Sequence, residues 1–216
     1  MSVPDRARDP LDHLIRSTVP TSAASAPPRR AGGTRSRAGN AMARTRAGLL
    51  DGARRAVVAR GARRTTMNDI AAEAGVAKAT LYNHFRTKDD VWAALVESEV
   101  RAIAAECAGM VLPEALAHAA CRLSEHPALR RVVESEPTAL AGLLARRPDS
   151  AGWRAADEAV RARLAAEGLA GDDLVLRWLA SHLAMPAPAS AARTAAETLA
   201  RGLPADPAAE TRRATA

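Results

Sequence analysis

The sequence TMNDIAAEAGVAKATLYNHF, residues 66–85, contains two short helical segments separated by a glycine. Thr66 and Asp69 have the spacing of a capping box, in which a threonine and an acidic side chain satisfy free N–H groups at a helix start. Gly75 marks the corner, because a tight turn between helices needs a residue that tolerates positive φ. A second helix is expected over about residues 77–85. The stretch therefore predicts a helix-turn-helix.

The second of these helices has one apolar and one polar face. Leu81 and Phe85 are four residues apart and share the inner face. The outer face carries polar and cationic side chains, namely Lys78, Thr80, Tyr82, Asn83 and His84. An ordinary helical hairpin in a larger α-domain would explain the two apolar residues but not the polar side chains opposite them. The DNA major groove admits an α-helix, so this outer face is a candidate for reading DNA.

Residues 71–91, AAEAGVAKATLYNHFRTKDDV, closely resemble the DNA-binding signature of the TetR family of bacterial transcriptional regulators. The resemblance covers roughly residues 44–107. It implies an all-α fold, with an N-terminal three-helix DNA-binding domain containing the helix-turn-helix and a C-terminal helical domain for ligand binding and dimerisation. It also implies a sequence-specific regulator, most often a repressor, whose homodimer binds a palindromic operator and is released by a small-molecule effector. One position departs from the pattern: many relatives carry serine where Ala77 stands, so the recognition helix is expected to lack its cap.

The resemblance and the residue chemistry divide the expected DNA contacts into two groups. Phosphate contacts, which fix register and read little sequence, are implied for Thr66, Tyr82, His84 and Lys88. Lysine donates to guanine, asparagine pairs with adenine, and small methyl groups contact the thymine methyl; the candidates to face bases are therefore Lys78, Ala79, Thr80 and Asn83. Near the start of the first helix, phosphates are within expected reach of Arg44 and Arg46.

Positive charge is concentrated in the first half of the chain. The 216 residues carry a net charge of +7 and are 48% apolar, enough for one or two domains with a sizeable core. Residues 1–43 hold seven arginines against three acidic residues, residues 44–107 hold eleven basic against eight acidic, and residues 108–216 hold thirteen of each. The excess accompanies the proposed DNA-binding unit.

Composition divides the chain into four segments. Residues 1–43 are rich in proline, serine and arginine without regular hydrophobic periodicity, and are expected to be disordered. They form either a basic tail that attracts phosphates or an overcalled start, with Met42 as the alternative first residue. A DNA-binding domain with its connecting helix is expected over 44–107, a regulatory and dimerisation domain over 108–203, and a disordered tail over 204–216.

Prolines at expected helix starts organise the second half of the chain. Helices are expected near 113–125, 127–134, 137–146, 150–168, 172–184 and 190–203. The resemblance implies that the last two pair with their mates in a four-helix dimer interface, through Leu174, Trp178, Leu179, Leu183, Ala191, Ala195 and Leu199. Two further core helices are the alternative.

The second half shows few signals of chemistry. An effector pocket is expected to use Met110, His118, Cys121, Leu140 and Trp153, and the scarcity of aromatic residues favours a modest apolar molecule. A metal-sensing regulator through His118, Cys121 and His126, or a redox switch through Cys107 and Cys121, stays open as a less favoured alternative. No metal or cofactor is expected to be needed.

Several function classes are disfavoured by what the sequence lacks. It has no glycine-rich phosphate loop, nucleophile elbow or HExxH motif, so an enzyme is not expected. No apolar run approaches the length of a membrane span, and two cysteines do not make a disulfide scaffold. A bacterial cytoplasmic protein, on the nucleoid when bound to DNA, is expected. A non-specific DNA-compacting protein is the main alternative to a regulator.

Overall fold

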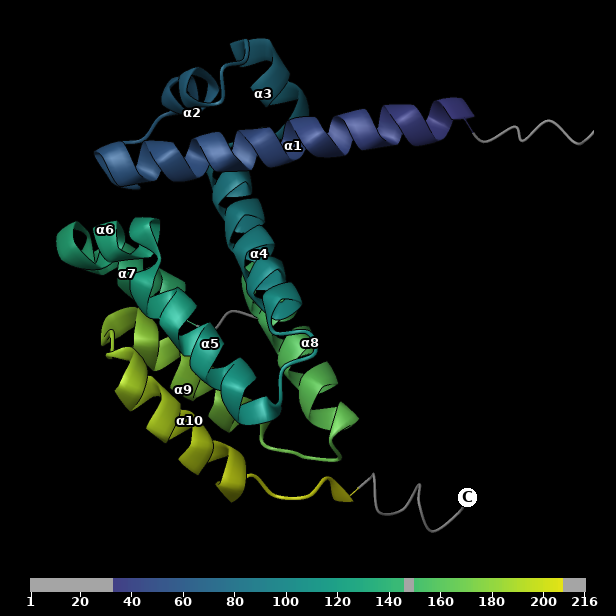
Figure 1. Cartoon of the computed structure of the whole chain (residues 1–216). Coiled ribbons are helices and arrows are strands. Elements are labelled where there is room, and N and C mark those ends of the chain that lie inside the picture. Colours follow the sequence, from purple (N-terminus) through teal and green to yellow (C-terminus); the bar gives the residue numbers. More distant parts are fainter. Residues whose placement is uncertain (1–32, 146–149, 208–216) are drawn as a thin grey trace, which may run out of the picture. The chain divides into compact units, whose positions relative to one another are not determined.

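The computed structural model describes residues 33–145 and 150–207, and these residues fold into helices. In chain order the helices are α1 (Gly33–Arg60), α2 (Met67–Glu73), α3 (Lys78–His84), α4 (Lys88–Glu106), α5 (Leu112–Glu125), α6 (Pro127–Ser135), α7 (Pro137–Leu144), α8 (Ala151–Ala166), α9 (Asp172–Ala184) and α10 (Ala189–Gly202) (Figure 1). The prediction of an all-α fold is confirmed. Within the described ranges, no helix is both long enough and apolar enough to span a bilayer.

The two ends of the chain differ from expectation. Helix α1 begins at Gly33, so residues 33–43 are helical where a disordered tail is expected. This segment contains no proline and several alanines and arginines, which favour helix. At the other end, backbone hydrogen bonds tie Pro204 and Asp206 to the loop between α8 and α9, so the expected C-terminal tail begins with ordered residues. The remainder of both expected tails lies outside the described residues.

The chain divides into two compact units, Met1–Gly39 and Asn40–Ala216, and the packing described below is that of the second. The expected boundary after residue 107 does not separate compact units. Helix α4 packs along α8. A small apolar cluster also joins Val57 of α1 to Ala128 and Val132 of α6. The helices expected to bind DNA therefore share packing with the rest of this unit.

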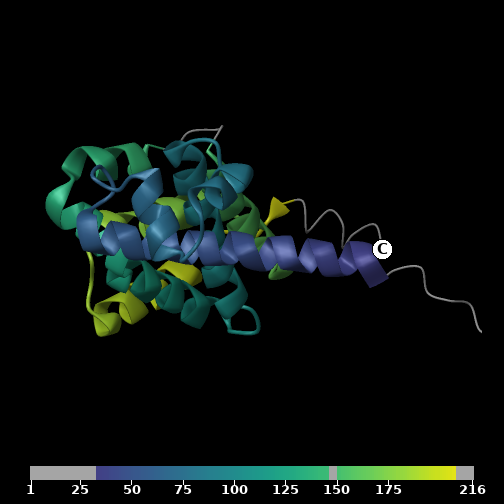
Figure 2. The same ribbon diagram turned by 90° about the horizontal axis from the view of Figure 1, so that it is seen from above.

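The first core of the unit lies among α1, α2, α3 and the start of α4. Leu49, Ile70, Leu81 and Val91 are fully buried in it, and Phe85 is nearly so. Figure 2 shows α2 and α3 beside the C-terminal half of α1, which supplies the apolar stripe they cover. The inward placement of residues 81 and 85 confirms the helical periodicity read from the sequence.

The second core lies among α5, α8, α9 and α10. It contains Leu116, Leu164, Val175 and Ala196. Both α9 and α10 pack on α5, and Figure 1 shows the three helices side by side. Because α5 occupies the apolar faces of α9 and α10, much of the apolar surface of those two helices is used within one protomer.

Candidate nucleic-acid interface and internal cavity

Helix α2 begins with the predicted capping box. The Thr66 hydroxyl accepts the N–H of Asp69 at 3.2 Å, and the Asp69 carboxylate accepts the N–H of Thr66 at 2.9 Å. These hydrogen bonds from Thr66 hold the pKa of Asp69 below its ordinary value. At the other end of α2, Gly75 has φ +67, so the corner uses the left-handed conformation expected of it.

Two arginines of α1 align α2. Arg60 pairs with Asp69 at 3.4 Å and with Glu73 at 3.2 Å. Arg55 approaches the Glu73 carboxylate at 3.7 Å and also pairs with Asp51. Exposed pairs of this kind are worth about 1 kcal/mol or less each, so they orient α2 more than they stabilise the fold. These two cations are already engaged with acidic groups.

The outer face of α3 is open to solvent. Lys78, Ala79 and Asn83 are exposed, and Tyr82, the only tyrosine of the chain, is 43% exposed. The Lys78 ammonium lies 5.6 Å from the centroid of the Tyr82 ring, within cation–π range. Thr80 and His84 are half-buried at the edges of this face. The structure therefore brings six of the predicted DNA-contacting residues onto one short helix.

Helix α3 starts without a side-chain cap, as its sequence predicts. Ala77 takes the extended N-cap conformation, and no side chain accepts a hydrogen bond from the first turn. We expect Ala77→Ser to raise stability by about 1 kcal/mol, because a serine hydroxyl would accept one of these N–H groups. Thermal unfolding measures the effect, with Ala72→Ser on the exposed side of α2 as the control. An equal rise for the control would contradict a capping effect.

Cations around α3 have intramolecular partners. The Arg46 guanidinium lies 4.5 Å from the centroid of the Phe85 ring. The Lys88 ammonium donates to the carbonyl oxygens of Ala62 at 3.3 Å and Arg63 at 3.1 Å. Arg44 is exposed near the start of the domain. Of these three cations predicted to contact phosphates, Arg46 and Lys88 thus also make contacts within the protein itself.

A hydrogen bond from the junction of α6 and α7 also fixes the loop between α1 and α2. The buried carboxylate of Glu136, at the junction of those helices, accepts the N–H of Arg63 at 3.0 and 3.2 Å. The buried Thr65 hydroxyl donates to the carbonyl of Gly61 at 2.6 Å. Sequence reasoning does not find Glu136, because no local pattern links it to a loop 73 residues earlier.

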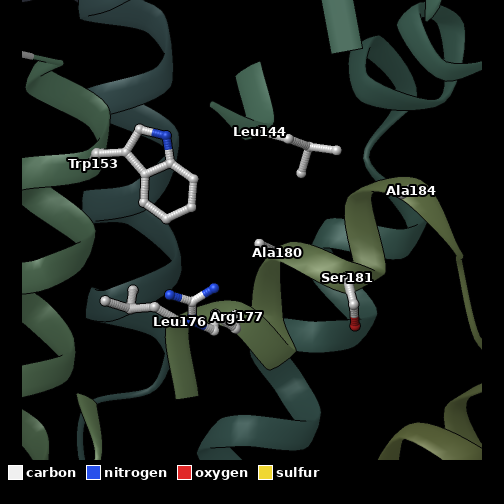
Figure 3. A pocket seen from close by; sticks show the side chains of 7 residues that line it. All are labelled: Leu144, Trp153, Leu176, Arg177, Ala180, Ser181 and Ala184. Carbon is white, nitrogen blue, oxygen red and sulfur yellow. The ribbon is translucent and has the colours of Figure 1, made fainter. Parts of the chain in front are cut away.

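A cavity of about 510 Å³ lies among α4, α5, α6, α8 and α9. Its wall is mostly aliphatic and includes the indoles of Trp92 and Trp153. A smaller hollow of about 280 Å³ shares Trp153 and Leu176 with it; Figure 3 shows these side chains with Arg177 and Ser181 of α9. The larger cavity has the size and apolar character of a small-molecule site.

Four strongly polar side chains interrupt this apolar wall: Glu99, His126, Ser150 and Arg163. His126 is the N-cap of α6, and its Nδ1 accepts the N–H of Leu129 at 3.3 Å. Its Nε2 lies 3.3 Å from Glu99 Oε2. The contact with His126 lowers the pKa of Glu99 against the opposing effect of burial, and Arg54 and Arg122 contribute at longer range. Glu99 is therefore ionised near neutral pH.

Of the five residues expected to line an effector pocket, only Trp153 lies on the cavity wall. Leu140 packs against the cluster of Val57, Ala128 and Val132. The other three residues are also absent from the wall: Met110, whose carbonyl accepts from Arg163, His118, which pairs with Glu106 at 2.8 Å, and the half-buried Cys121. The cavity-facing residues of α5 are 112, 115, 116, 119 and 123, which have helical spacing. That periodicity is the signal that would have found them.

The residues considered for metal sensing do not converge. His118 pairs with Glu106, whereas His126 faces Glu99. Within the described ranges no group of three or more histidine, cysteine or acidic side chains is placed to hold a metal ion. Cys107 and Cys121 are both free thiols, and burial raises the pKa of Cys107.

The residues expected at a dimer interface face different ways. Leu174 is 52% exposed and Ala191 is exposed, and Ala195 is half-buried. Trp178, Leu179 and Leu199 pack against the second core of their own protomer, and Leu183 lines the cavity. The difference arises because α9 and α10 turn their larger apolar residues toward α5 and α8.

Comparison with known proteins gives a family match for residues 49–95 and a likeness of fold over a larger part of the chain. Residues 49–95 match the family described as bacterial regulatory proteins, tetR family. Among solved structures, the TetR family repressor AlkX from Dietzia sp., implicated in biodegradation of n-alkanes, is 20% identical with a TM-score of 0.53, and the match covers 72% of this chain and 93% of that one. GusR of Salmonella enterica is 21% identical with a TM-score of 0.51, over 72% and 91% of the two chains. Curated protein sequences gave no match. At these identities the structural likeness shows the fold alone.

Proposed function

We propose that this chain, whose residues 49–95 match the tetR family of bacterial regulatory proteins, is a repressor whose homodimer binds a palindromic operator. We further propose that a small molecule in the cavity releases it from DNA. Double-stranded DNA and a second copy of the chain are its expected partners, and no catalytic role is proposed. The observation that carries the proposal is the solvent-open polar face of α3 above a fully buried Leu81.

The proposed contacts on DNA follow from the exposure of α3. The helix would enter the major groove with Lys78, Ala79, Thr80 and Asn83 toward the bases. Phosphates would be bound by Tyr82, His84, the helix start at Thr66 and the cations Arg44, Arg46 and Lys88. Arg46 and Lys88 reach phosphate only by adding to, or leaving, the intramolecular contacts they make here.

A pair of recognition helices is needed to read two half-sites, which supports a homodimer. We propose that α9 and α10 form its interface, with Leu174 and Ala191 as its exposed residues. The half-buried residues proposed for the same interface, each with part of its side chain still accessible, are Trp178, Leu179, Leu183, Ala195 and Leu199.

Two substitutions test which side chain contacts phosphates and which one reads the bases. We expect Tyr82→Ala to weaken binding to operator and random DNA alike, by roughly fivefold, because a phosphate contact carries no sequence information. Lys78→Ala should instead reduce the preference for operator over random DNA, by about tenfold. Titrations of both DNAs by fluorescence anisotropy give the two affinities for each variant.

Two further variants control these titrations. Tyr82→Phe keeps the ring beside Lys78 and removes only the hydroxyl, and Arg201→Ala removes an exposed charge from the distant α10. Arg201→Ala should leave both affinities unchanged. Equal losses on the two DNAs for both Tyr82→Ala and Lys78→Ala would refute the division of roles.

The proposed function itself is tested by a gel-shift titration at about 150 mM salt, where non-specific attraction is screened. The DNA is the intergenic region upstream of the protein's own gene, with random DNA of equal length as competitor. A discrete complex preferring its site by at least about a thousandfold supports a regulator. Binding that random DNA abolishes, there and in a genome-wide search for sites, would leave only non-specific affinity.

A further inference from the structure

The contact between Glu99 and His126 is a polar feature of the mostly apolar cavity wall and is incompletely satisfied. Glu99 lies on α4 and His126 at the start of α6, and the His126 side chain is only 6% exposed. Nε2 lies 3.3 Å from Glu99 Oε2 but is not well aligned for a hydrogen bond, and the buried Nε2 has no other partner among the described residues. An incompletely bonded ring nitrogen on an apolar wall is costly, so it favours a ligand group that completes its bonding.

The protonation of the two side chains defines what that group must be. His126 Nδ1 accepts the N–H of Leu129, so the hydrogen of the neutral ring is on Nε2, which is a donor. Glu99 is held ionised and only accepts. The site therefore offers one donor, His126 Nε2–H, and one acceptor, Glu99 Oε2, at a distance of 3.3 Å. A hydroxyl group satisfies both, because its oxygen accepts from Nε2–H while its O–H donates to the carboxylate.

Other ligand groups fit this pair less well. A carboxylate has no proton to donate and is repelled by Glu99, an ammonium has no acceptor for Nε2–H, and an ether or ketone leaves Glu99 unmatched. The alternative polar group on the wall is Arg163, which would favour an anion. Its Nη2 group already donates to Glu167 at 2.6 Å and to the Met110 carbonyl at 2.7 Å, so its charge is paired, although its buried Nε has no partner among the described residues.

The volume limits the ligand. At about 30 Å³ for each small group, a cavity of about 510 Å³ holds on the order of 15 non-hydrogen atoms. We propose that the cavity binds an apolar alcohol of this size, with its hydroxyl between Glu99 and His126 and its hydrocarbon part along the wall toward Trp153. The proposed ligand class follows from the cavity itself. Only the inference that this ligand releases the protein from DNA rests on the proposed function.

A ligand hydroxyl at this position would couple ligand binding to the position of α1. His126 caps α6, and the next turns of α6 place Ala128 and Val132 against Val57 of α1. On the other side of the pair, Glu99 belongs to α4, whose first turns complete the core under α3. A hydroxyl inserted between the two side chains would separate α4 from the start of α6. Both helices contact the part of the chain that carries α2 and α3.

The test compares two isomers that differ only in the O–H group, 1-dodecanol and methyl undecyl ether, together with dodecanoic acid. Binding is followed by the fluorescence of Trp92 and Trp153, which both line the cavity, and by calorimetry. The alcohol should bind about tenfold more tightly than the ether and the acid. Equal affinity of the two isomers, tighter binding of the acid, or no saturable binding of the alcohol would overturn the proposal.

Variants assign the preference to the pair. Glu99→Leu should remove the advantage of the alcohol while leaving ether binding intact, which also reports that the cavity is still formed. His126→Asn, which keeps a capping side chain at the start of α6, should reduce the preference in the same way. Glu97→Gln, on the same helix but paired with Arg101 and absent from the wall, is the matched control and should leave the alcohol preference unchanged. An undiminished alcohol preference in Glu99→Leu would overturn the assignment.

Failure of this proposal and failure of the proposed function are distinguishable. The gel-shift titration uses the protein without any alcohol, so its outcome does not depend on the ligand class. Added 1-dodecanol should dissociate the operator complex of the wild type at concentrations that saturate the fluorescence change. Alcohol binding without an effect on a specific complex would refute the regulatory meaning and retain the ligand class.

Discussion

Gly52→Ala is expected to destabilise the protein by about 3 kcal/mol, the upper part of the range for overpacked sites. A Cβ at residue 52 would lie 2.7 Å from both the backbone nitrogen and the Cβ of Ala74. Ala74 ends α2, where its N–H is bonded to the Ile70 carbonyl just before the corner at Gly75. These atoms cannot retreat without breaking the end of α2. Thermal unfolding should show a midpoint lower by about 6 °C or more.

The same helix provides the control for Gly52→Ala. An added Cβ at Gly48, one turn earlier in α1, meets nothing within 4 Å. We expect Gly48→Ala to stabilise the protein by about 0.5–1 kcal/mol, because alanine loses less backbone entropy in a helix than glycine does. The same substitution, glycine to alanine, should thus lower the free energy of unfolding at residue 52 and raise it at residue 48. Stabilisation by both substitutions would show that α1 and α2 are not in close contact at residue 52.

Glu136→Ala is expected to lower the free energy of unfolding by about 1–3 kcal/mol, since the Arg63 N–H would lose its buried charged acceptor. The substitution would also detach the loop before α2 from the junction of α6 and α7. Urea denaturation measures the stability. Operator release by 1-dodecanol should require a higher concentration in the variant, because one of the contacts between α6–α7 and the loop is lost.

Glu134→Ala is the matched control for this second substitution. Glu134 lies two residues earlier on α6, is exposed and pairs with Arg130 at 3.4 Å. It should change stability by less than about 0.5 kcal/mol. A comparable loss in both variants would attribute the effect to the helix α6 itself rather than to the bond with Arg63.

The sequence was sufficient to predict features that depend on interactions between residues close together in the chain. The capping pair Thr66 and Asp69, the positive φ of Gly75 and the missing cap at Ala77 each depend on residues within one turn, and the structure has all three as predicted. Prolines at helix starts likewise located α5, α6 and α7, because a proline ring fits the first turn and little else of a helix. The exposed outer face of α3 followed from a spacing of four residues.

Partners distant in sequence explain most of what was missed. Residues 33–43 are the exception, because their own helix propensity extends α1 although they carry no hydrophobic periodicity. Four of the five expected pocket residues lie off the cavity wall. His118 and Cys121 were chosen for their chemistry, but the rotation of α5 that points residues 116 and 119 at the cavity turns these two away. Larger residues of α9 and α10 that were expected at an interface between protomers are half-buried against the second core, and their place at an interface stays a prediction.

The sequence by itself determined an all-α fold with a capped, glycine-cornered helix-turn-helix, whose second helix has an exposed polar face. Such features depend on helix periodicity and on hydrogen bonds between residues a few positions apart. The tertiary structure alone decided that Gly52 must lack a side chain, that Glu136 holds the loop at Arg63, and that Glu99 meets His126 at the cavity. Each of these depends on helices distant in sequence approaching within a few ångströms, and residue spacing along one helix carries no information about that approach.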